Sequence, residues 1–281
     1  MSGILYVVAT PIGNLEDVTL RALRILREVA LIAAEDTRRT SRLLQHYSIS
    51  TPTTSLHEHN ERRKSEHLIA RLRAGESIAL VSDAGTPLVS DPGAYLVSQA
   101  HAAGVKVEPV PGPSAAMAAL SAAGFGEGPV HFVGFPPPKG SAREEWFATI
   151  RSLTGVLVLY EAPHRIRDTL GDLLRVLGDC QTLLSRELTK AHEELIKRPI
   201  TAHLSVLTDP RGEFTLVVDL PVSEPQTEPL PTDSDLASEL GRITESGGVT
   251  RRAALRTLAE KYGAPVREVY ARVERAKASG D

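Results

Sequence analysis

The sequence predicts an α/β protein made of two α/β domains and a small helical appendage. Short β-branched runs alternate with amphipathic helical stretches, which is typical of a mainly parallel sheet covered by helices. A segment dense in Gly and Pro at 124–145 indicates a junction between two such blocks. A Pro-bearing stretch without a basic residue then precedes the C-terminal part. We therefore expect α/β domains at 1–123 and 124–221, an acidic linker at 222–239 and the appendage at 240–281.

The first domain is expected to alternate strands with helices. Apolar runs predict buried strands, and stretches with apolar residues three or four positions apart predict helices, the last of which ends at Gly104. The strands are expected at 4–9, 31–34, 77–82 and 105–110, and the helices at 18–29, 62–73 and 94–103.

The second domain and the tail show fewer clear elements. PPPKGS at 136–141 predicts a mobile loop. Residues 249–276 predict two helices joined by a turn at 262–265, in the manner of a helix-turn-helix. The strands of the second domain are expected at 156–160, 181–185 and 214–218, with a helix at 165–177.

Composition and charge exclude several classes of protein. The 281 residues are 42% apolar, enough for hydrophobic cores, and a single cysteine, Cys180, excludes a disulfide framework and a multi-cysteine zinc site. No stretch approaches the roughly 20 apolar residues that span a bilayer, and the N-terminus lacks a basic segment followed by an apolar core. We expect a cytoplasmic protein with no membrane role. The net charge of −3 argues against indiscriminate nucleic-acid binding but allows a local basic surface.

Common nucleotide-binding and catalytic motifs are absent. The loop after the first predicted strand, ATPIGNLEDVT at 9–19, contains neither G-x-G-x-x-G nor G-x-x-x-x-G-K-[ST], so dinucleotide binding and P-loop phosphate transfer lose their main support. There is no G-x-S-x-G elbow, and His57-Glu58-His59 alternates where a zincin pair needs helical spacing. On spacing alone, these histidines belong to a solvated loop.

One loop is a candidate ligand site. Residues 81–93, VSDAGTPLVSDPG, follow an apolar run, and their small residues leave the backbone around Asp83 and Asp91 open to a bound molecule. Any strand-to-helix turn uses the same residue types. In open α/β sheets, however, ligands bind beyond the carboxyl ends of the strands, which is where this loop is expected.

Nine stretches, in this order, together resemble the tetrapyrrole methylase superfamily of S-adenosyl-L-methionine (SAM) dependent methyltransferases. The resemblance covers about residues 4–221. Corrin-forming members usually carry a Gly-rich first loop and a G-D-P triplet where this chain has ATPIGN and SDAGTP, and this departure favours the branch that methylates a cytidine ribose 2′-hydroxyl in 16S rRNA. The stretches are LYVVATPIGNLEDVT (5–19), AAEDTRRTSRLL (33–44), SLHEHNE (55–61), LVSDAGTPLVSDPG (80–93), PVPGPSA (109–115), HFVGFPP (131–137), YEAPHR (160–165), SRELTKAHEE (185–194) and GEFTLVV (212–218).

The resemblance implies two α/β domains of the tetrapyrrole methylase type with the active cleft between them. It also implies that backbone at Ile12, Thr86 and Ala115 holds the adenosine and methionine parts of SAM, and that Tyr160 approaches from the second domain. No metal is expected. The full set of expected SAM-binding residues is Pro11, Ile12, Asp83, Ala84, Gly85, Thr86, Ser114, Ala115 and Tyr160.

Methyl transfer from a sulfonium needs alignment and exclusion of water more than it needs chemical activation. A ribose hydroxyl is a weak nucleophile, so a general base that removes its proton increases the reaction rate about 10²–10⁴-fold. The candidate catalytic residues are Glu35, Asp36 and Glu187, with His57 also considered, and Asp36 is favoured among them. Structural roles compete with this one, because Glu35 and Asp36 can cap a helix that begins near Thr40 and Glu187 can pair with a nearby basic residue.

Basic and polar side chains in the motif loops are expected to form a phosphate-contacting rim around the cleft, because they lie near predicted strand ends. The aromatic content of 4% favours recognition of a shaped rRNA segment over generic single-strand stacking. The candidate substrate-binding residues are Arg38, Arg39, Arg42, His57, Asn60, Arg165, Arg186 and Lys190.

The C-terminal appendage allows two interpretations of its role, and the whole chain allows three interpretations of its function. From Thr250 onward there are eight Lys or Arg against four acidic residues, so this part of the chain could contact nucleic acid. The alternative is that it only packs against the rest of the protein. Besides the rRNA methyltransferase, the chain is compatible with a family member that methylates a tetrapyrrole or a protein, and with a nucleic-acid-binding regulator that senses a ligand without catalysis. The expected partners are 16S rRNA within an assembled small ribosomal subunit and a second copy in a homodimer.

Overall fold

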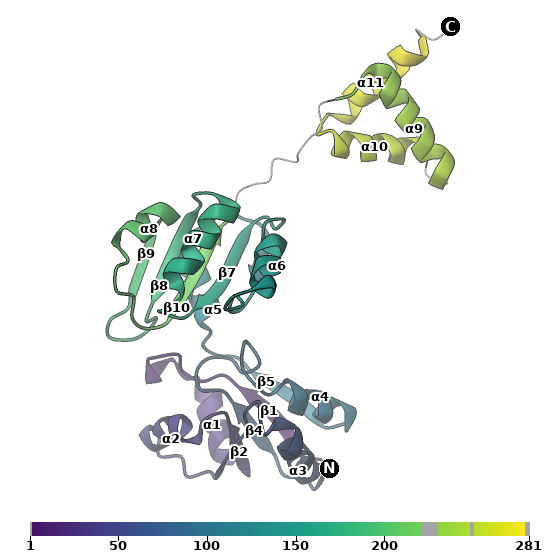
Figure 1. The fold of residues 1–281 in the computed structure, drawn as a ribbon. Helices are drawn as coiled ribbons and strands as arrows, with labels where there is room; N and C mark the ends of the chain where they lie inside the picture. The colour runs from purple at the N-terminus through teal and green to yellow at the C-terminus, as the bar shows by residue number, and fades with distance from the viewer. Residues whose placement is uncertain (1, 221–229, 248–249, 279–281) are drawn as a thin grey trace. The chain divides into compact units, whose positions relative to one another are not determined.

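The computed structural model describes residues 2–220, 230–247 and 250–278. The chain divides into two compact units, Met1–Pro221 and Val222–Asp281 (Figure 1). The first unit contains two five-stranded sheets with helices, and the second is helical. The α/β class predicted from the sequence is therefore confirmed. Within the described ranges, no helix combines the length and the apolar character needed to cross a membrane.

The first sheet is wholly parallel and is covered on both faces. Its strand order is β3-β2-β4-β1-β5. The strands are β1 (Ile4–Val8), β2 (Leu31–Ala34), β3 (Thr53–Ser55), β4 (Ile78–Val81) and β5 (Lys106–Val110), and the helices are α1 (Leu20–Glu28), α2 (Thr37–His46), α3 (Glu61–Arg73) and α4 (Ala94–Ala102).

The two faces of this sheet follow from the alternation of side chains along each strand. Ile32 and Ala34 of β2 pack with α1 and α2, whereas Leu31 and Ala33 pack with α3 and α4. Every residue of β2 and β4 is buried, which explains why these strands read as continuous apolar runs. Because the strands are parallel, all five carboxyl ends meet at one edge of the sheet.

The second sheet is mixed, with strand order β6-β7-β10-β8-β9. β6 and β7 are parallel, and β10 runs antiparallel to both of its neighbours. The strands are β6 (Val130–Phe132), β7 (Val156–Glu161), β8 (Gln181–Arg186), β9 (Glu194–Pro199) and β10 (Phe214–Asp219), and the helices are α5 (Ala115–Ala123), α6 (Ser141–Ile150), α7 (Ile166–Leu177) and α8 (Ile200–Val206).

Helices α6 to α8 cover one face of this sheet and α5 covers the other (Figure 1). Ala116 and Ala119 of α5 pack against Val158 and Val217, because small side chains let the helix approach the strands closely. The boundary predicted after residue 123 would thus assign α5 to the first domain, although this helix packs on the second sheet. Gly124 ends this helix in the left-handed conformation, with φ +55°.

The C-terminal unit is a bundle of three helices, α9 (Asp233–Gly247), α10 (Arg251–Lys261) and α11 (Val266–Ala278). Its core contains Leu236, Leu240, Leu258, Val269 and Val273. The two helices predicted at 249–276 and their intervening turn are confirmed. Helix α9 begins inside the range 222–239 that was predicted as a linker, so that part of the prediction is wrong. Proline and acidic residues obscured the apolar spacing of the helix. Residues 222–229 of the predicted linker lie outside the described residues.

The strands and helices predicted in the first unit are all present, with bounds within two residues of those observed. The prediction missed the short or polar elements, among them β3, β6, β9, α6 and α8. Helix α1 is shorter at both ends than the helix predicted at 18–29. It begins later because Thr19 caps it, by accepting a hydrogen bond from the Ala22 N–H.

Candidate active site

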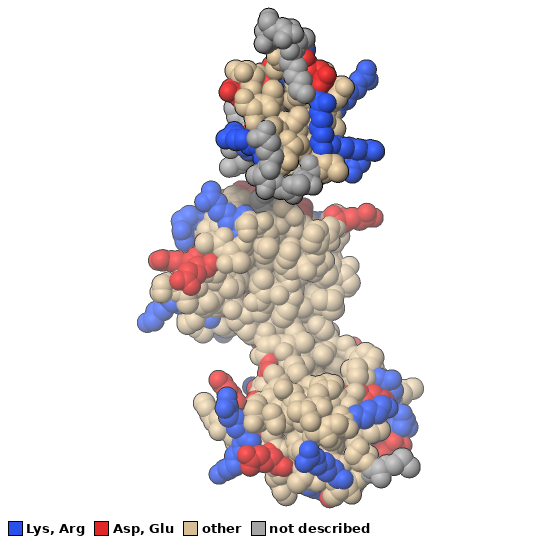
Figure 2. Space-filling model, turned by 90° about the vertical axis from the view of Figure 1, so that its right-hand side faces the viewer, with Lys and Arg blue, Asp and Glu red and all other residues tan. Residues whose placement is uncertain are grey.

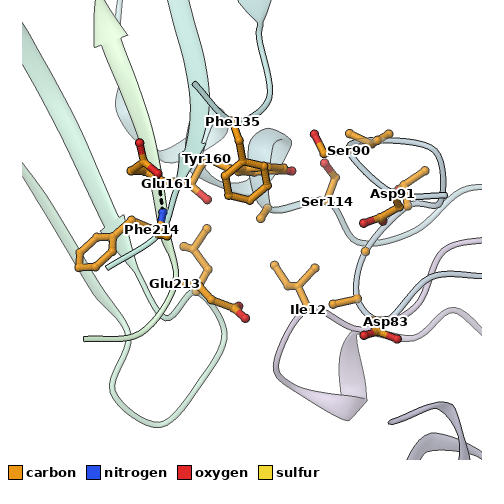
Figure 3. Close-up of a pocket in the computed structure, with 18 of the residues that line it drawn as sticks. Ile12, Asp83, Ser90, Asp91, Ser114, Phe135, Tyr160, Glu161, Glu213 and Phe214 are labelled. Atoms are coloured by element: carbon orange, nitrogen blue, oxygen red, sulfur yellow. Dashed lines mark hydrogen bonds between the residues drawn. The ribbon is translucent and has the colours of Figure 1, made fainter. Parts of the chain in front are cut away.

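A cavity of about 440 Å³ lies between the carboxyl edge of the first sheet and the facing ends of β7 and β10 (Figure 3). This volume falls in the range of roughly 300–1,000 Å³ that small-molecule sites occupy. Its walls come from loops that the sequence separates widely, including those after β1, β4 and β5 on one side and the loop after β6 on the other.

Three loops of the first sheet are joined by hydrogen bonds at this edge. Thr10 and Gly85 exchange two backbone hydrogen bonds, of 2.8 and 2.9 Å, and the Thr86 hydroxyl donates to the Pro113 carbonyl at 3.1 Å. Gly85 has φ +82°, and a Cβ there would lie 3.4 Å from a methyl carbon of Ile12. Both backbone polar groups of Gly85 are thus used within the protein, and its positive φ favours glycine in this turn.

Backbone strain concentrates in two loops beside the cavity. Leu88 and Ser90 have φ values of 70° and 69°, and Glu187 and Thr189 have φ values of 52° and 64°. Such left-handed conformations cost non-glycine residues on the order of 1–3 kcal/mol each and cluster at functional sites. The strain is thus consistent with these loops having been shaped for binding.

The second sheet contributes an aromatic wall. Tyr160, near the end of β7, lies 5.5 Å from Phe135 between ring centroids, and half of the Phe135 surface is exposed. The Tyr160 hydroxyl accepts a hydrogen bond from the Ala116 N–H at 3.3 Å, in the first turn of α5. Burial raises the pKa of Tyr160, so this hydroxyl stays protonated at neutral pH. A flat apolar group such as a purine fits against these rings.

A buried network holds the aromatic wall in place. The Glu161 side chain is fully buried, lies 3.3 Å from Arg165 Nε and accepts a hydrogen bond of 2.5 Å from the Thr169 hydroxyl. Arg165 Nη2 also donates to the carbonyl oxygens of Pro136 and Pro137, next to Phe135. Only 20% of the Arg165 side chain is exposed. The structure therefore gives Arg165, expected to bind RNA, a role in shaping the pocket.

Three acidic residues lie at the first-sheet side of the pocket: Glu35, Asp83 and Asp91. Asp83 accepts the Asp36 N–H at 2.9 Å, and Glu35 accepts the Asp83 N–H at 3.2 Å. Burial raises the pKa of Glu35 above its usual value. Burial, together with the charges of Glu35 and Asp83, raises the pKa of Asp91 to about 6.

Asp36 and Glu187, the other expected catalytic residues, do not line the cavity. Asp36 caps α2, and its hydrogen bonds from Arg38 lower its pKa to about 2. Glu187 accepts the Glu213 N–H at 2.9 Å and the Lys190 ammonium at 3.0 Å, and the first of these bonds lowers its pKa most. Carboxylates stabilised in this way are weak bases, so the structure favours Glu35 over both.

The remaining expected residues divide into two groups. All of the expected SAM-binding residues except Pro11, which is buried, line the cavity. Among the expected RNA-binding residues, Arg39 reaches the cavity, and Arg38 and Arg42 lie on the exposed side of α2. His57 and Asn60 hydrogen-bond each other after β3. Arg186 and Lys190 are engaged with acidic neighbours and backbone, through Glu194, Arg211, Glu187 and Glu213.

Several lining residues were not selected from the sequence. Phe135, Glu213 and Phe214 lie within two of the family stretches, and Asp91 lies in the loop singled out as a ligand site, so membership of a motif was the available signal. In the described ranges, no three His, Cys, Asp or Glu side chains are grouped so that they could hold a metal ion.

Solved structures with the same fold are methyltransferases and related enzymes. The uroporphyrin-III C-methyltransferase of Thermus thermophilus superposes with a TM-score of 0.58, at 20% identity over 77% of this chain and 97% of that one. A diphthine synthase superposes with a TM-score of 0.61, at 16% identity over 78% and 90%. The fold is therefore that of the tetrapyrrole methylase class.

Sequence comparison agrees with the fold. The family model of Tetrapyrrole (Corrin/Porphyrin) Methylases matches residues 4–202. The proteins named Ribosomal RNA small subunit methyltransferase I from Synechocystis sp. and Pseudomonas aeruginosa are 44% and 49% identical to this chain, over 95% and 77% of it and over 96% and 79% of their own lengths. The chain belongs to the tetrapyrrole methylase family and, within it, to the group of these small subunit methyltransferases.

SAM, the cofactor predicted from the sequence, is the methyl donor in this family, and one solved neighbour of the same fold is a complex with S-adenosyl homocysteine. The pocket of this chain fits SAM on chemical grounds. Tyr160 and Phe135 offer an aromatic surface for adenine, and carboxylates match a ligand that carries a sulfonium and an ammonium. When bound, SAM supplies an activated methyl group, and these residues orient it.

Proposed function

We propose that this protein uses SAM to methylate the ribose 2′-hydroxyl of a cytidine in the 16S rRNA of the small ribosomal subunit. The observation that carries the proposal is the convergence of family stretches from both sheets on one cavity. The chain is also 44% identical, over 95% of its length, to a relative named Ribosomal RNA small subunit methyltransferase I. The choice of ribose and of cytidine rests on the resemblance of the loops ATPIGN (9–14) and SDAGTP (82–87) to that branch.

The reaction requires a ribose oxygen in line behind the methyl carbon and a place for the hydroxyl proton. Glu35 is the general base that we propose, because it lines the cavity and its raised pKa makes it a better base than Asp36 or Glu187. The hydrogen bond from the Asp83 N–H fixes the position of its carboxylate.

RNA is proposed to approach over α2. Arg38, Arg39 and Arg42 project from this helix beside the cavity, and 89% of the Arg38 side chain is exposed. Figure 2 shows a broad face of the second α/β domain with few charged side chains, and we assign no phosphate contacts to that face. The helical unit adds Arg252 and Arg256, which are exposed on α10.

The substrate is proposed to be an assembled small subunit. The protein itself is proposed to be a cytoplasmic homodimer. An assembled substrate suits a chain with few aromatic residues, which reads RNA shape more readily than it stacks single-stranded bases. A tetrapyrrole or protein acceptor is the second candidate, since the solved neighbours include a uroporphyrin-III methyltransferase and a diphthine synthase.

The decisive experiment incubates the protein with methyl-labelled SAM and EDTA, together with free 16S rRNA, purified small subunits or uroporphyrinogen III, and then maps the label. Label on one cytidine ribose in small subunits is the expected result. Label on a base, on protein or on the tetrapyrrole would contradict the proposal, and SAM binding without transfer to any acceptor would favour the ligand-sensing regulator.

A further inference from the structure

Among the described residues, Asp91 is one of two acidic residues of the pocket that lack a basic partner, the other being Glu35. Five carboxyl groups and one guanidinium line the cavity. In the part of the chain that the structure describes, no Lys, Arg or His forms an ion pair with Asp91, and the same holds for Glu35, which instead accepts the Asp83 N–H. The other three are paired: Asp83 with Arg39 at 3.4 Å, Glu161 with Arg165 at 3.3 Å and Glu213 with Lys190 at 3.0 Å.

The loop around Asp91 has an unusual backbone conformation. Leu88, Ser90 and Gly93 all have positive φ values, of 70°, 69° and 122°, and a Cβ on Gly93 would lie 2.7 Å from a methyl carbon of Leu80. This contorted backbone holds Asp91 next to Ser114, on the side of the pocket that faces Phe135 and Tyr160 (Figure 3).

The electrostatic environment of Asp91 favours a cation. The titratable groups that face it are Glu35, Asp83 and Tyr160, and Arg39, the single guanidinium of the lining, is paired with Asp83. Burial and the two neighbouring carboxylates raise the pKa of Asp91 to about 6. The residue is therefore ionised above pH 6 at a cost in free energy, and a positive charge in the cavity reduces that cost.

We propose that Asp91 is a specificity-determining residue of the cofactor site, whose carboxylate makes the pocket bind positively charged SAM in preference to its neutral product, S-adenosyl homocysteine. The two ligands share the adenosine, the ammonium and the carboxylate, and they differ in the sulfonium charge that methyl transfer removes. A carboxylate that recognises this charge speeds exchange of product for fresh cofactor. The proposal rests only on SAM as the methyl donor, and it holds for every acceptor considered above.

The test measures binding of SAM and of S-adenosyl homocysteine separately, by calorimetry at pH 7.5 and low salt, without RNA. Asp91→Asn keeps the shape of the side chain and removes its charge. It is expected to weaken SAM binding roughly tenfold or more while changing the binding of S-adenosyl homocysteine less than about threefold. Glu213→Gln is the matched control, because Lys190 already compensates Glu213, and the ratio of the two affinities is expected to stay within twofold.

The pH dependence provides a second measurement in the wild-type protein. Asp91 must be ionised to attract the sulfonium, so the preference for SAM is expected to decline as the pH falls from 7.5 to 5. Bound SAM lowers the pKa of Asp91, so SAM binding at pH 6 should release protons, detected as a dependence of the binding heat on the buffer. Asp91→Asn should abolish this release, whereas Asp91→Glu should retain both the release and the preference for SAM.

Three results would overturn the proposal. Equal losses of affinity for both ligands in Asp91→Asn would make Asp91 a structural residue of the loop. Unchanged affinities for both ligands would leave Asp91 without a role in charge recognition. A loss of the preference for SAM in Glu35→Gln but not in Asp91→Asn would assign the role to Glu35. If Asp91→Asn does not fold, the wild-type proton release and the Asp91→Glu variant decide the question. None of these results depends on which RNA is methylated.

Discussion

The backbone N–H of Asn14 donates a hydrogen bond of 3.0 Å to the Thr189 hydroxyl, which joins the loop after β1 of the first sheet to the loop after β8 of the second. Gly13 lies at the same junction, and a Cβ there would be 2.6 Å from Lys190 Cγ and 2.9 Å from the Leu188 carbonyl oxygen. The two loops therefore meet closely enough that glycine is required on one side. Ile12 and Leu188, which line the cavity, flank this contact.

Gly13→Ala is expected to push these loops apart and to weaken SAM binding, with a loss of about 1–3 kcal/mol in the free energy of unfolding, as for other overpacked sites. Calorimetry and thermal unfolding measure the two effects. Gly171→Ala is the control, because Gly171 lies in α7 where a Cβ meets nothing within 4 Å, and this variant should be neutral or stabilising. Equal behaviour of the two variants would refute the tight contact.

Arg165→Leu is expected to lower the free energy of unfolding by about 3–5 kcal/mol, because it leaves the fully buried Glu161 without its basic partner. Denaturant unfolding measures the change. Arg175→Ala is the comparison, since 68% of that side chain is exposed and its ion pair with Asp172 contributes little. Adding Glu161→Gln to Arg165→Leu should recover part of the stability. If Arg165→Leu instead weakens RNA binding at unchanged stability, the residue contacts RNA as the sequence first indicated.

Glu35→Gln is expected to reduce the rate of methyl transfer at saturating SAM by about 10²-fold or more, whereas Asp36→Asn should reduce it less than tenfold. The reason is that Asp36, with a pKa of about 2, is a weak base, and asparagine can still cap α2. Single-turnover kinetics on the RNA substrate separate the rate from the affinity. A larger effect at Asp36 than at Glu35 would restore Asp36 as the base.

Deletion of residues 222–281 is expected to preserve SAM binding, because Met1–Pro221 forms its own compact unit and contains the whole cavity. RNA binding should weaken and its salt dependence should flatten, since fewer phosphate contacts release fewer counterions. Replacing both Arg252 and Arg256 with serine in the full chain should reduce the salt slope by up to about 2. An unchanged affinity and slope in the deletion would show that the helical unit takes no part in RNA binding.

Local sequence determined the α/β alternation, the paired helices at the C-terminus and the glycine-containing loop after β4. These features depend on neighbours in the chain: strands such as Ile78–Val81 are buried on both faces and read as apolar runs, and Gly85 marks a turn that requires a positive φ. A ligand site beyond strand ends follows from the parallel order of the first sheet, so the positions of Asp83 and Thr86 were predictable.

Tertiary structure alone decided which charged side chains are free to act. Asp36 and Glu35 are adjacent in sequence, yet Asp36 is held ionised by Arg38, whereas Glu35 is partly buried in the wall of the cavity. The Arg165 side chain is occupied by the carbonyl oxygens of Pro136 and Pro137, which lie far from it in sequence. Asp91, in contrast, has no Lys, Arg or His partner among the described residues, and burial raises its pKa. The protonation state and availability of such a group are set by burial and by neighbours across the fold, and residue spacing carries no record of either.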